Sequence, residues 1–374
     1  MADHPSDHAV PGGEKERPAI EPILDGASPH PAGLPAELEG EREIARDESR
    51  ELEERLEAYE NIIDSEVGDT SLVRARNIER EHSLRQLYLK FDGGNPTGTQ
   101  KDRIAFAQAM DALRRGYEAM TAASCGNYGA ALALAASYAN LGCIIYIPSG
   151  YRSRRIDEMR SLGAIIMTIE GDYEAAVDAS RERAGREEVY DANPGGANTA
   201  IQMRAYGEIA HEIYDDLRDA PAAVAVPVSN GTTLAGIYRG FASLYRRGKT
   251  SRMPRMVAGS SFRKNPIVQS FVRGTPDCEN LDPAAIRETA VNEPLINWHS
   301  IDGDLALNAI RETGGWAGYA SDRSMVSQAR AIRESEGLSV LPASTAGLIA
   351  LLEGHRRAPL TSDRFVVVIT GRKT

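Results

Sequence analysis

The sequence predicts an α/β fold with open, mostly parallel sheets. From about Val67 onward, short apolar segments typical of buried strands alternate with longer segments of helical periodicity. Several apolar segments end directly in a turn rich in Gly, Ser or Asn that opens the next helix. Because ligands bind at the carboxyl ends of parallel strands, we expect the functional site at these turns. The predicted strands cover residues 87–91, 119–123, 143–147, 164–169, 222–228, 256–259 and 365–370.

Length and composition narrow the class of protein. The 374 residues are enough for more than one domain. The net charge of −11 argues against nucleic acid as the main partner, since phosphate backbones attract basic surfaces. The three cysteines have no CxxC spacing, so we expect neither a disulfide framework nor a metal site. No stretch approaches the roughly 18 apolar residues of a membrane span. The first residues lack a secretory signal, so we expect a cytoplasmic protein with no membrane partner.

The N-terminal segment, residues 1–63, differs from the rest of the chain. Residues 1–36 contain seven prolines and little periodicity, which predicts a mobile tail. From about Glu37 to Ile63 the pattern is helical and acidic, with Leu52, Leu56, Tyr59 and Ile63 on one face. The pattern favours a solvated helix packed on the body of the protein over an arm that reaches a partner subunit.

A lysine follows the first of the predicted strand ends. The loop 93–98 contains three glycines and a proline, and Lys101 stands near the start of the next helix. The helix dipole disfavours an ammonium charge at that end, and burial would lower the pKa of the amine further, which makes it nucleophilic. A surface lysine that happens to follow a turn would give the same local sequence.

Three other strand ends carry small polar residues. Residues 124–129 could bind a carboxylate through exposed N–H groups, or simply cap a helix through Ser124 or Asn127. Residues 229–233 resemble a phosphate cradle without a Walker or GxGxxG motif. The last strand closes in Thr370, which by itself is an ordinary strand end. None of these turns decides a function alone.

The order and content of the four turns together indicate a family. Residues 88–103 closely resemble the cofactor-lysine segment of threonine synthases, within the tryptophan-synthase-β-like (fold type II) group of pyridoxal-phosphate enzymes. The resemblance covers roughly residues 67–371. It continues in the family's order through residues 124–127, 227–231, 336–344 and 370–371.

The resemblance implies a two-domain fold type II architecture with an N-terminal helical extension. We expect a large cofactor-binding domain from residues 64–110 and 190–374. Residues 111–189 should form a smaller inserted α/β domain with four strands, and the cofactor should lie between the two domains. The family also implies a homodimer.

The resemblance further implies roles for individual residues. Lys101 would bind pyridoxal 5′-phosphate as a Schiff base and then move protons at Cα and Cβ of the substrate. Asn127 would bind the phenolic oxygen, and Thr370 would face the pyridine nitrogen through a neutral hydroxyl, which favours elimination and replacement over transamination. The cofactor phosphate would be held by Ser229, Asn230, Gly231, Thr232 and Thr233. The substrate carboxylate would be held by the loop of Ser124, Cys125, Gly126, Asn127 and Tyr128.

Departures from the threonine-synthase pattern bear on the substrate. The arginine that usually follows Asn193-Pro194 and binds the phosphate of O-phosphohomoserine is absent. An unpaired phosphate dianion is costly to desolvate, so another cation must replace the arginine or the substrate differs. The candidate cations are Arg103, Arg204, Arg263 and Lys264. The other departures are Gln100, Cys125, Tyr128, Ser229, Thr233 and Leu341.

We therefore predict a pyridoxal-phosphate-dependent lyase with threonine-synthase-like elimination and replacement at Cβ and Cγ of a small amino acid. The alternative is a β-eliminating or β-replacing enzyme, similar to serine/threonine dehydratases or cysteine synthases. A non-catalytic binding module is a third interpretation. The joint presence of Lys101, Asn127 and Thr370 argues against it.

Overall fold

The computed structural model describes residues 35–151, 153–361 and 363–373. Its larger sheet has six strands in the order β1-β2-β10-β7-β8-β9, in which β1 is antiparallel to β2 and all other neighbours are parallel. The central strands β7 and β10 are continuous apolar runs, as expected for strands covered on both faces. The strands are β1 (Leu72–Arg74), β2 (Leu87–Phe91), β7 (Ala223–Pro227), β8 (Arg255–Ser261), β9 (Trp316–Ala320) and β10 (Phe365–Ile369).

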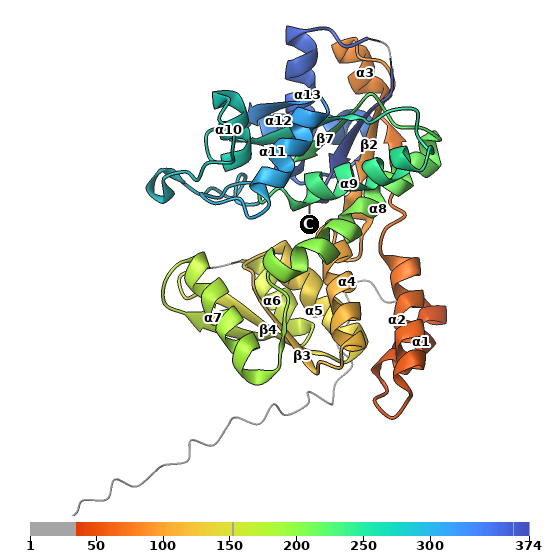
Figure 1. The fold of residues 1–374 in the computed structure, drawn as a ribbon, viewed down its shortest axis with the longest axis vertical. Helices are drawn as coiled ribbons and strands as arrows, with labels where there is room; N and C mark the ends of the chain where they lie inside the picture. Colours follow the sequence, from red (N-terminus) through yellow and green to blue (C-terminus); the bar gives the residue numbers. More distant parts are fainter. Residues whose placement is uncertain (1–34, 152, 362, 374) are drawn as a thin grey trace, which may run out of the picture.

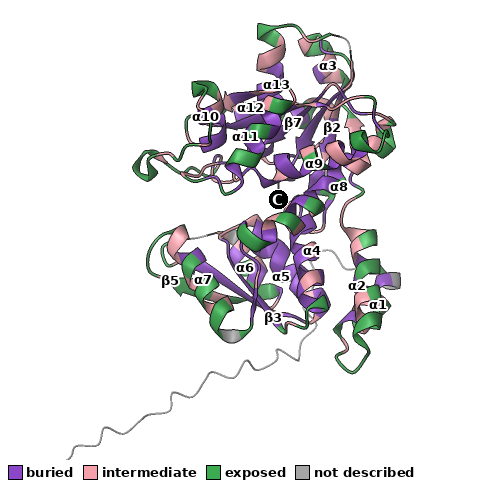
Figure 2. Cartoon of the chain, in the orientation of Figure 1, coloured by how far each residue is buried: buried purple, intermediate pink, exposed green. Residues whose placement is uncertain are grey.

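A second sheet lies in a separate body of the molecule. Its four strands are all parallel, in the order β5-β4-β3-β6. Figure 1 shows this sheet in the lower body and the six-stranded sheet in the upper body, and Figure 2 shows that their inner strands are buried. The edge strands β1 and β5 are partly or largely exposed. The strands are β3 (Ala119–Ala123), β4 (Gly142–Pro148), β5 (Ile165–Ile169) and β6 (Tyr190–Asp191). The α/β fold class predicted from the sequence is confirmed.

Helices cover both sheets and connect the two bodies. Helix α4 packs against both α5 and α8, where the upper and lower bodies meet (Figure 1). Helices α8 and α9 approach closely because Gly240 has no side chain, and a Cβ there would lie 2.5 Å from the carbonyl oxygen of Gly207. After two N-terminal helices, the chain contains α3 (Arg76–His82), α4 (Lys101–Arg114), α5 (Asn127–Ala139), α6 (Arg154–Ser161), α7 (Tyr173–Glu187), α8 (Thr199–Leu217), α9 (Thr232–Arg246), α10 (Pro266–Arg273), α11 (Gly303–Glu312), α12 (Asp322–Glu336) and α13 (Ala346–Arg357).

The N-terminal extension contains two helices, α1 (Ala36–Arg46) and α2 (Leu52–Glu66), and not the single helical run expected over 37–63. The break has a local cause. The carboxylate of Asp47 accepts hydrogen bonds from the backbone N–H (3.0 Å) and the hydroxyl (2.6 Å) of Ser49, which stabilises a turn in place of helix. The predicted mobile tail lies almost entirely outside the described residues.

Helix α2 packs on the chain's own body. Tyr59 is fully buried, its ring stacks on Phe106 of α4 at 6.0 Å between centroids, and its hydroxyl donates to the carbonyl oxygen of Ala135 (2.9 Å). The predicted apolar face is correct at Tyr59 and wrong at Leu52, which is 40% exposed.

The limits predicted for the two domains stay a prediction. The four strands of the smaller sheet are consecutive in the chain, and the strands of the larger sheet come from both flanks. Within the described part of the chain, no helix has the length and apolar character that crossing a membrane requires.

Candidate active site

Lys101 and Thr370 lie next to each other although they are far apart in the sequence. Lys101 is the first residue of α4, and Thr370 follows directly after β10. The N–H of Gln100 donates to the carbonyl oxygen of Thr370 (3.0 Å), and Thr99 pairs with Gly371 in an antiparallel bridge. Gly98 allows this approach, since its φ is +88° and a Cβ there would lie 2.7 Å from the side chain of Arg372. The lysine is therefore fixed at the end of the central strand.

The amine of Lys101 is desolvated and has no ion pair or hydrogen bond among the described residues. Burial lowers its pKa from 10.5 to about 8, and the negative charge of Glu293 opposes part of this shift. An amine with this pKa is substantially neutral near pH 8, as a nucleophile that attacks a carbonyl must be. Lys101 thus has the properties expected of a Schiff-base lysine.

The loop before α5 uses Ser124 as a helix cap. Its hydroxyl oxygen accepts hydrogen bonds from the N–H groups of Gly129 (2.8 Å) and Gly126 (3.4 Å). Tyr128 is buried, and its hydroxyl donates to the side-chain oxygen of Gln108 (2.7 Å), so that only its backbone can serve the site. Burial, together with Glu293 and Glu288, raises the pKa of the Cys125 thiol to about 12, so this cysteine is not an activated nucleophile.

Residues 229–233 form a cradle at the start of α9. The backbone N–H groups of Asn230, Gly231 and Thr232 donate to no described residue, so they are free to bind an anion at the positive end of the helix. Gly231 has φ +93°, and a Cβ there would lie 2.7 Å from the carbonyl oxygen of Asp302. This arrangement fits a phosphate group.

Polar side chains from other segments support this cradle through hydrogen bonds. The carbonyl oxygen of Ser229 accepts hydrogen bonds from Asn265 Nδ2 and Ser300 Oγ, both at 2.9 Å. Asn297 Nδ2 donates to Asn230 Oδ1 (2.8 Å), and the hydroxyl of Thr232 donates to Asp302 Oδ2 (2.5 Å). Sequence reasoning did not find these supporting residues, because they lie in segments that no strand end or motif marks.

Glu293 is a further residue that the sequence did not indicate. Its Oε1 accepts a hydrogen bond from the hydroxyl of Tyr151 (3.4 Å) and lies 3.8 Å from the position that a Cβ on Gly126 would occupy. Burial and the nearby Glu288 raise the pKa of Glu293. A carboxyl group therefore lies against the predicted substrate-carboxylate loop and close enough to affect Lys101.

Arg155 of α6 is another residue near the site that the sequence did not indicate. Its Nε donates to Asn127 Oδ1 (3.1 Å), and its Nη2 donates to the carbonyl oxygen of Thr97 (3.0 Å). Glu158, three residues further along the helix, pairs with Nη1 at 2.6 Å. The sequence gives only a weak signal for this role, since Arg155 stands in a run of exposed-looking arginines.

The candidate cations for a substrate phosphate are mostly engaged elsewhere. Arg103 is buried between Asp92 (2.9 Å) and Glu212 (2.5 Å). Lys264 donates to the carbonyl oxygen of Arg287, Arg263 lies over the ring of Phe262, and Arg204 is exposed on α8. Asn193 binds the N–H of Ala123 (2.8 Å) and the hydroxyl of Ser180 (3.0 Å), which is a structural role.

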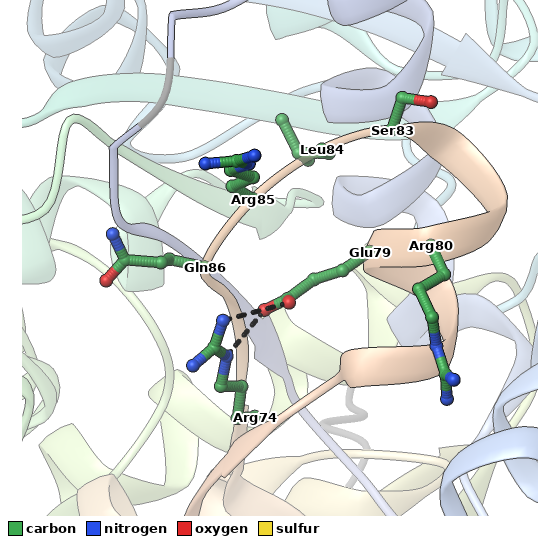
Figure 3. A pocket seen from close by; sticks show the side chains of 7 residues that line it. All are labelled: Arg74, Glu79, Arg80, Ser83, Leu84, Arg85 and Gln86. Atoms are coloured by element: carbon green, nitrogen blue, oxygen red, sulfur yellow. Dashed lines mark hydrogen bonds and ion pairs between the residues drawn. The ribbon is translucent and has the colours of Figure 1, made fainter.

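A surface cavity of about 720 Å³ lies elsewhere, beside α3 (Figure 3). Arg74 and Glu79 form a two-bonded ion pair there, at 2.9 and 3.1 Å. None of the predicted site residues lines this cavity. Its lining consists of Arg74, Glu79, Arg80, Ser83, Leu84, Arg85 and Gln86.

Comparison with known proteins identifies the family of the chain. Residues 63–371 match the family model described as pyridoxal-phosphate dependent enzyme. The chain belongs to this family. Threonine synthase of Methanocaldococcus jannaschii is 28% identical over 305 residues, covering 81% of this chain and 74% of that protein. Threonine synthase of Bacillus sp. is 29% identical over 306 residues, covering 81% of this chain and 82% of that protein.

Solved structures of other enzymes share the fold. Threonine deaminase isoform 2 from Solanum lycopersicum superimposes with a TM-score of 0.69 at 16% identity, covering 85% of this chain and 90% of that chain. Maize serine racemase gives a TM-score of 0.69 at 19% identity, covering 85% and 94%. The family confirms the predictions of a pyridoxal-phosphate cofactor and of a lyase that depends on it. The roles of the individual site residues stay predictions.

Proposed function

We propose that Lys101 carries pyridoxal 5′-phosphate as a Schiff base, and that the enzyme eliminates or replaces a group at Cβ or Cγ of an amino acid. The observation that carries this proposal is the desolvated, unpaired amine of Lys101 next to Thr370. The free N–H groups at residues 230–232 support a place for the cofactor phosphate at the start of α9. When bound, the cofactor stabilises negative charge at Cα of the substrate.

The chain's own residues have distinct tasks in this proposal. Asn127 would donate to the phenolic oxygen of the cofactor, and the N–H groups at the start of α5 would bind the substrate carboxylate. Lys101 would hold the cofactor and move protons at Cα and Cβ of the substrate. Thr370 would offer the pyridine nitrogen a neutral hydroxyl, which does not force a proton onto it.

We propose further that the substrate side chain carries no phosphate. Two observations support this part. The usual arginine after Asn193-Pro194 is absent, and Arg103, Lys264 and Arg263 already have partners elsewhere in the structure. A small amino acid with a neutral or cationic leaving group fits better, which keeps β-elimination and β-replacement as the second candidate reaction.

Borohydride reduction of the holoenzyme tests the Schiff base, because mass spectrometry of the peptides should place the reduced cofactor on Lys101. A screen of O-phosphohomoserine, O-phosphoserine, O-acetylserine, serine and 2,3-diaminopropionate tests the substrate. We expect turnover of the uncharged or cationic compounds only. Conversion of O-phosphohomoserine to threonine with kcat/KM above about 10⁴ M⁻¹s⁻¹, the low end of ordinary enzymes, would overturn the substrate proposal and leave the Schiff base standing.

The assembly and location belong to the proposal as well. We propose a cytoplasmic homodimer, as the family resemblance implies. Light scattering on the full chain should give twice the 40.5 kDa chain mass. Deleting residues 1–34 tests whether this segment contributes to the dimer, because it leaves helices α1 and α2 intact. Deleting residues 1–60 would also remove Tyr59 and expose Phe106 of the same chain, so a change in mass could not be assigned to the contact between subunits.

A further inference from the structure

Arg155 connects the two segments that present the reactive groups. Through Nε it reaches the side chain of Asn127 at the start of α5, and through Nη2 it reaches the loop that leads to Lys101. Its own side chain is 13% exposed and is neutralised by Glu158. No other described residue bonds to the side chain of Asn127.

The contact with Asn127 determines how the amide is turned. A guanidinium group only donates hydrogen bonds, so the atom facing Arg155 must be the amide oxygen. The amide nitrogen then points the other way, and it donates to no described residue. Without Arg155 the Asn127 side chain would lose its one hydrogen bond to the described residues, and most of its rotamers would direct no donor to the place where one is needed.

The contact with Thr97 extends the connection to Lys101. The N–H and hydroxyl of Thr97 donate to the carboxylate of Asp102, at 2.9 and 2.8 Å. Asp102 follows Lys101 directly and is fully buried. A single guanidinium group therefore holds the Asn127 amide and the Lys101 loop in one geometry.

We propose that Arg155 is a positioning residue that turns the amide of Asn127 so that its nitrogen donates to the phenolic oxygen of the cofactor. This inference rests on the proposed role of Asn127. The acceptor would be an ionised oxygen, and a hydrogen bond to a charged group is worth about 1.5–3 kcal/mol, equivalent to roughly 10- to 150-fold in binding. Part of that gain depends on the amide being held in advance.

The test compares Arg155→Met, Arg155→Lys and Arg160→Met. Arg160 lies on the same helix and, among the described residues, pairs with Asp157 alone, with both side chains mostly exposed, so it controls for loss of a positive charge on α6. Cofactor binding to the apoprotein is titrated, and the visible and near-ultraviolet absorbance bands are compared across pH. For Arg155→Met we expect about 10-fold weaker cofactor binding and a smaller visible fraction at a given pH, because the ionised phenolic oxygen loses a fixed donor. Arg155→Lys should recover part of both effects, and Arg160→Met should match the wild type.

A double-mutant cycle separates positioning from other roles. If Arg155 acts through Asn127, adding Arg155→Met to Asn127→Ala should weaken cofactor binding no further. Additive losses would mean that Arg155 acts on its own, for example as a charge partner of Asp102, and would overturn the proposal. Thermal melting of each apoprotein shows whether a variant is folded. If Arg155→Met binds cofactor as the wild type does, this inference fails and the Lys101 proposal stands. If the wild type forms no Schiff base at Lys101, the proposed function fails.

Discussion

Two regions that contain basic residues lie close together in the sequence. They differ in whether their charges are paired with carboxylates. In the first, Lys90 and Arg103 are buried and paired with Asp92 and Glu212. Burial alone would raise the pKa of Glu212, but the two cations outweigh it and hold this pKa at about 2. In the second, Lys101 is desolvated without a paired carboxylate, and its pKa falls to about 8.

The two regions show that neighbouring basic residues can contribute to stability in one case and to reactivity in the other. Charges that must stay ionised are surrounded by partners, which compensates the cost of their burial. The amine that must react is left without one, and its pKa moves toward the working range. Replacing residues in each region should therefore affect different measurements.

The largest expected effect is on reactivity. Lys101→Ala should abolish the visible Schiff-base band and lower kcat/KM by at least about 10³-fold, because the covalent bond and the proton transfers are both lost. Since the side chain of Lys101 forms no hydrogen bond or ion pair with any residue that the structure describes, the apoprotein should stay folded. If this variant shows a visible band that borohydride bleaches, and the reduced cofactor then stays bound through dialysis, the Schiff base is on another lysine.

The next effect is on stability and concerns the paired region. Arg103→Met leaves Asp92 and Glu212 buried with only Lys90 to compensate them. Breaking a buried pair in this way costs about 3–5 kcal/mol in free energy of unfolding, which denaturant titration of the apoprotein can measure. Arg74→Met removes a surface ion pair whose arginine side chain is 40% exposed, and it should cost far less, because solvent screens such pairs. Equal losses of free energy of unfolding in Arg103→Met and Arg74→Met would show that the buried pairs stabilise the protein no more than an exposed ion pair does.

The pH dependence of stability should separate the two regions as well. The pKa of Glu212 is depressed by folding, so its contribution is present above its ordinary pKa of 4.5 and is lost as pH falls through about 2. A shift of this size corresponds to about 3 kcal/mol. The wild type should therefore lose more free energy of unfolding than Glu212→Gln over this range. Parallel curves for the two proteins would show that Glu212 does not contribute in this way.

How far the sequence predicts this molecule depends on whether a feature is local. The strands Leu87–Phe91 and Ala119–Ala123 match their predicted limits because each is an apolar run ended by a turn. Strand β1 was missed, since three residues at a sheet edge give no periodicity, and β9 was missed because Trp316–Ala320 is rich in small residues.

The residues of the site also divide into those that a local sequence signal marks and those that it does not. The predicted residues follow strand ends, where parallel topology brings distant turns to one edge. Glu293 and Arg155 reach the site from a long loop and from a helix of the other body, and their positions depend on packing that no motif records. Both were found only from the structure.

The smallest predicted effect concerns Glu293, the charged group among the described residues that shifts the pKa of Lys101. The carboxylate of Glu293 stabilises the ammonium form and so raises the pKa of Lys101 against the effect of burial. Glu293→Gln should therefore lower this pKa below about 8. The Schiff base forms from the neutral amine, so the rate at which apoprotein regains its visible band should reach half its maximum at a correspondingly lower pH. Glu288→Gln is the matched control, because Glu288 affects Glu293 and Cys125 but is not among the groups that shift Lys101. A midpoint that stays at the wild-type pH in Glu293→Gln would mean that solvent screens this carboxylate from the lysine, and a rise would mean that its charge acts in the opposite sense.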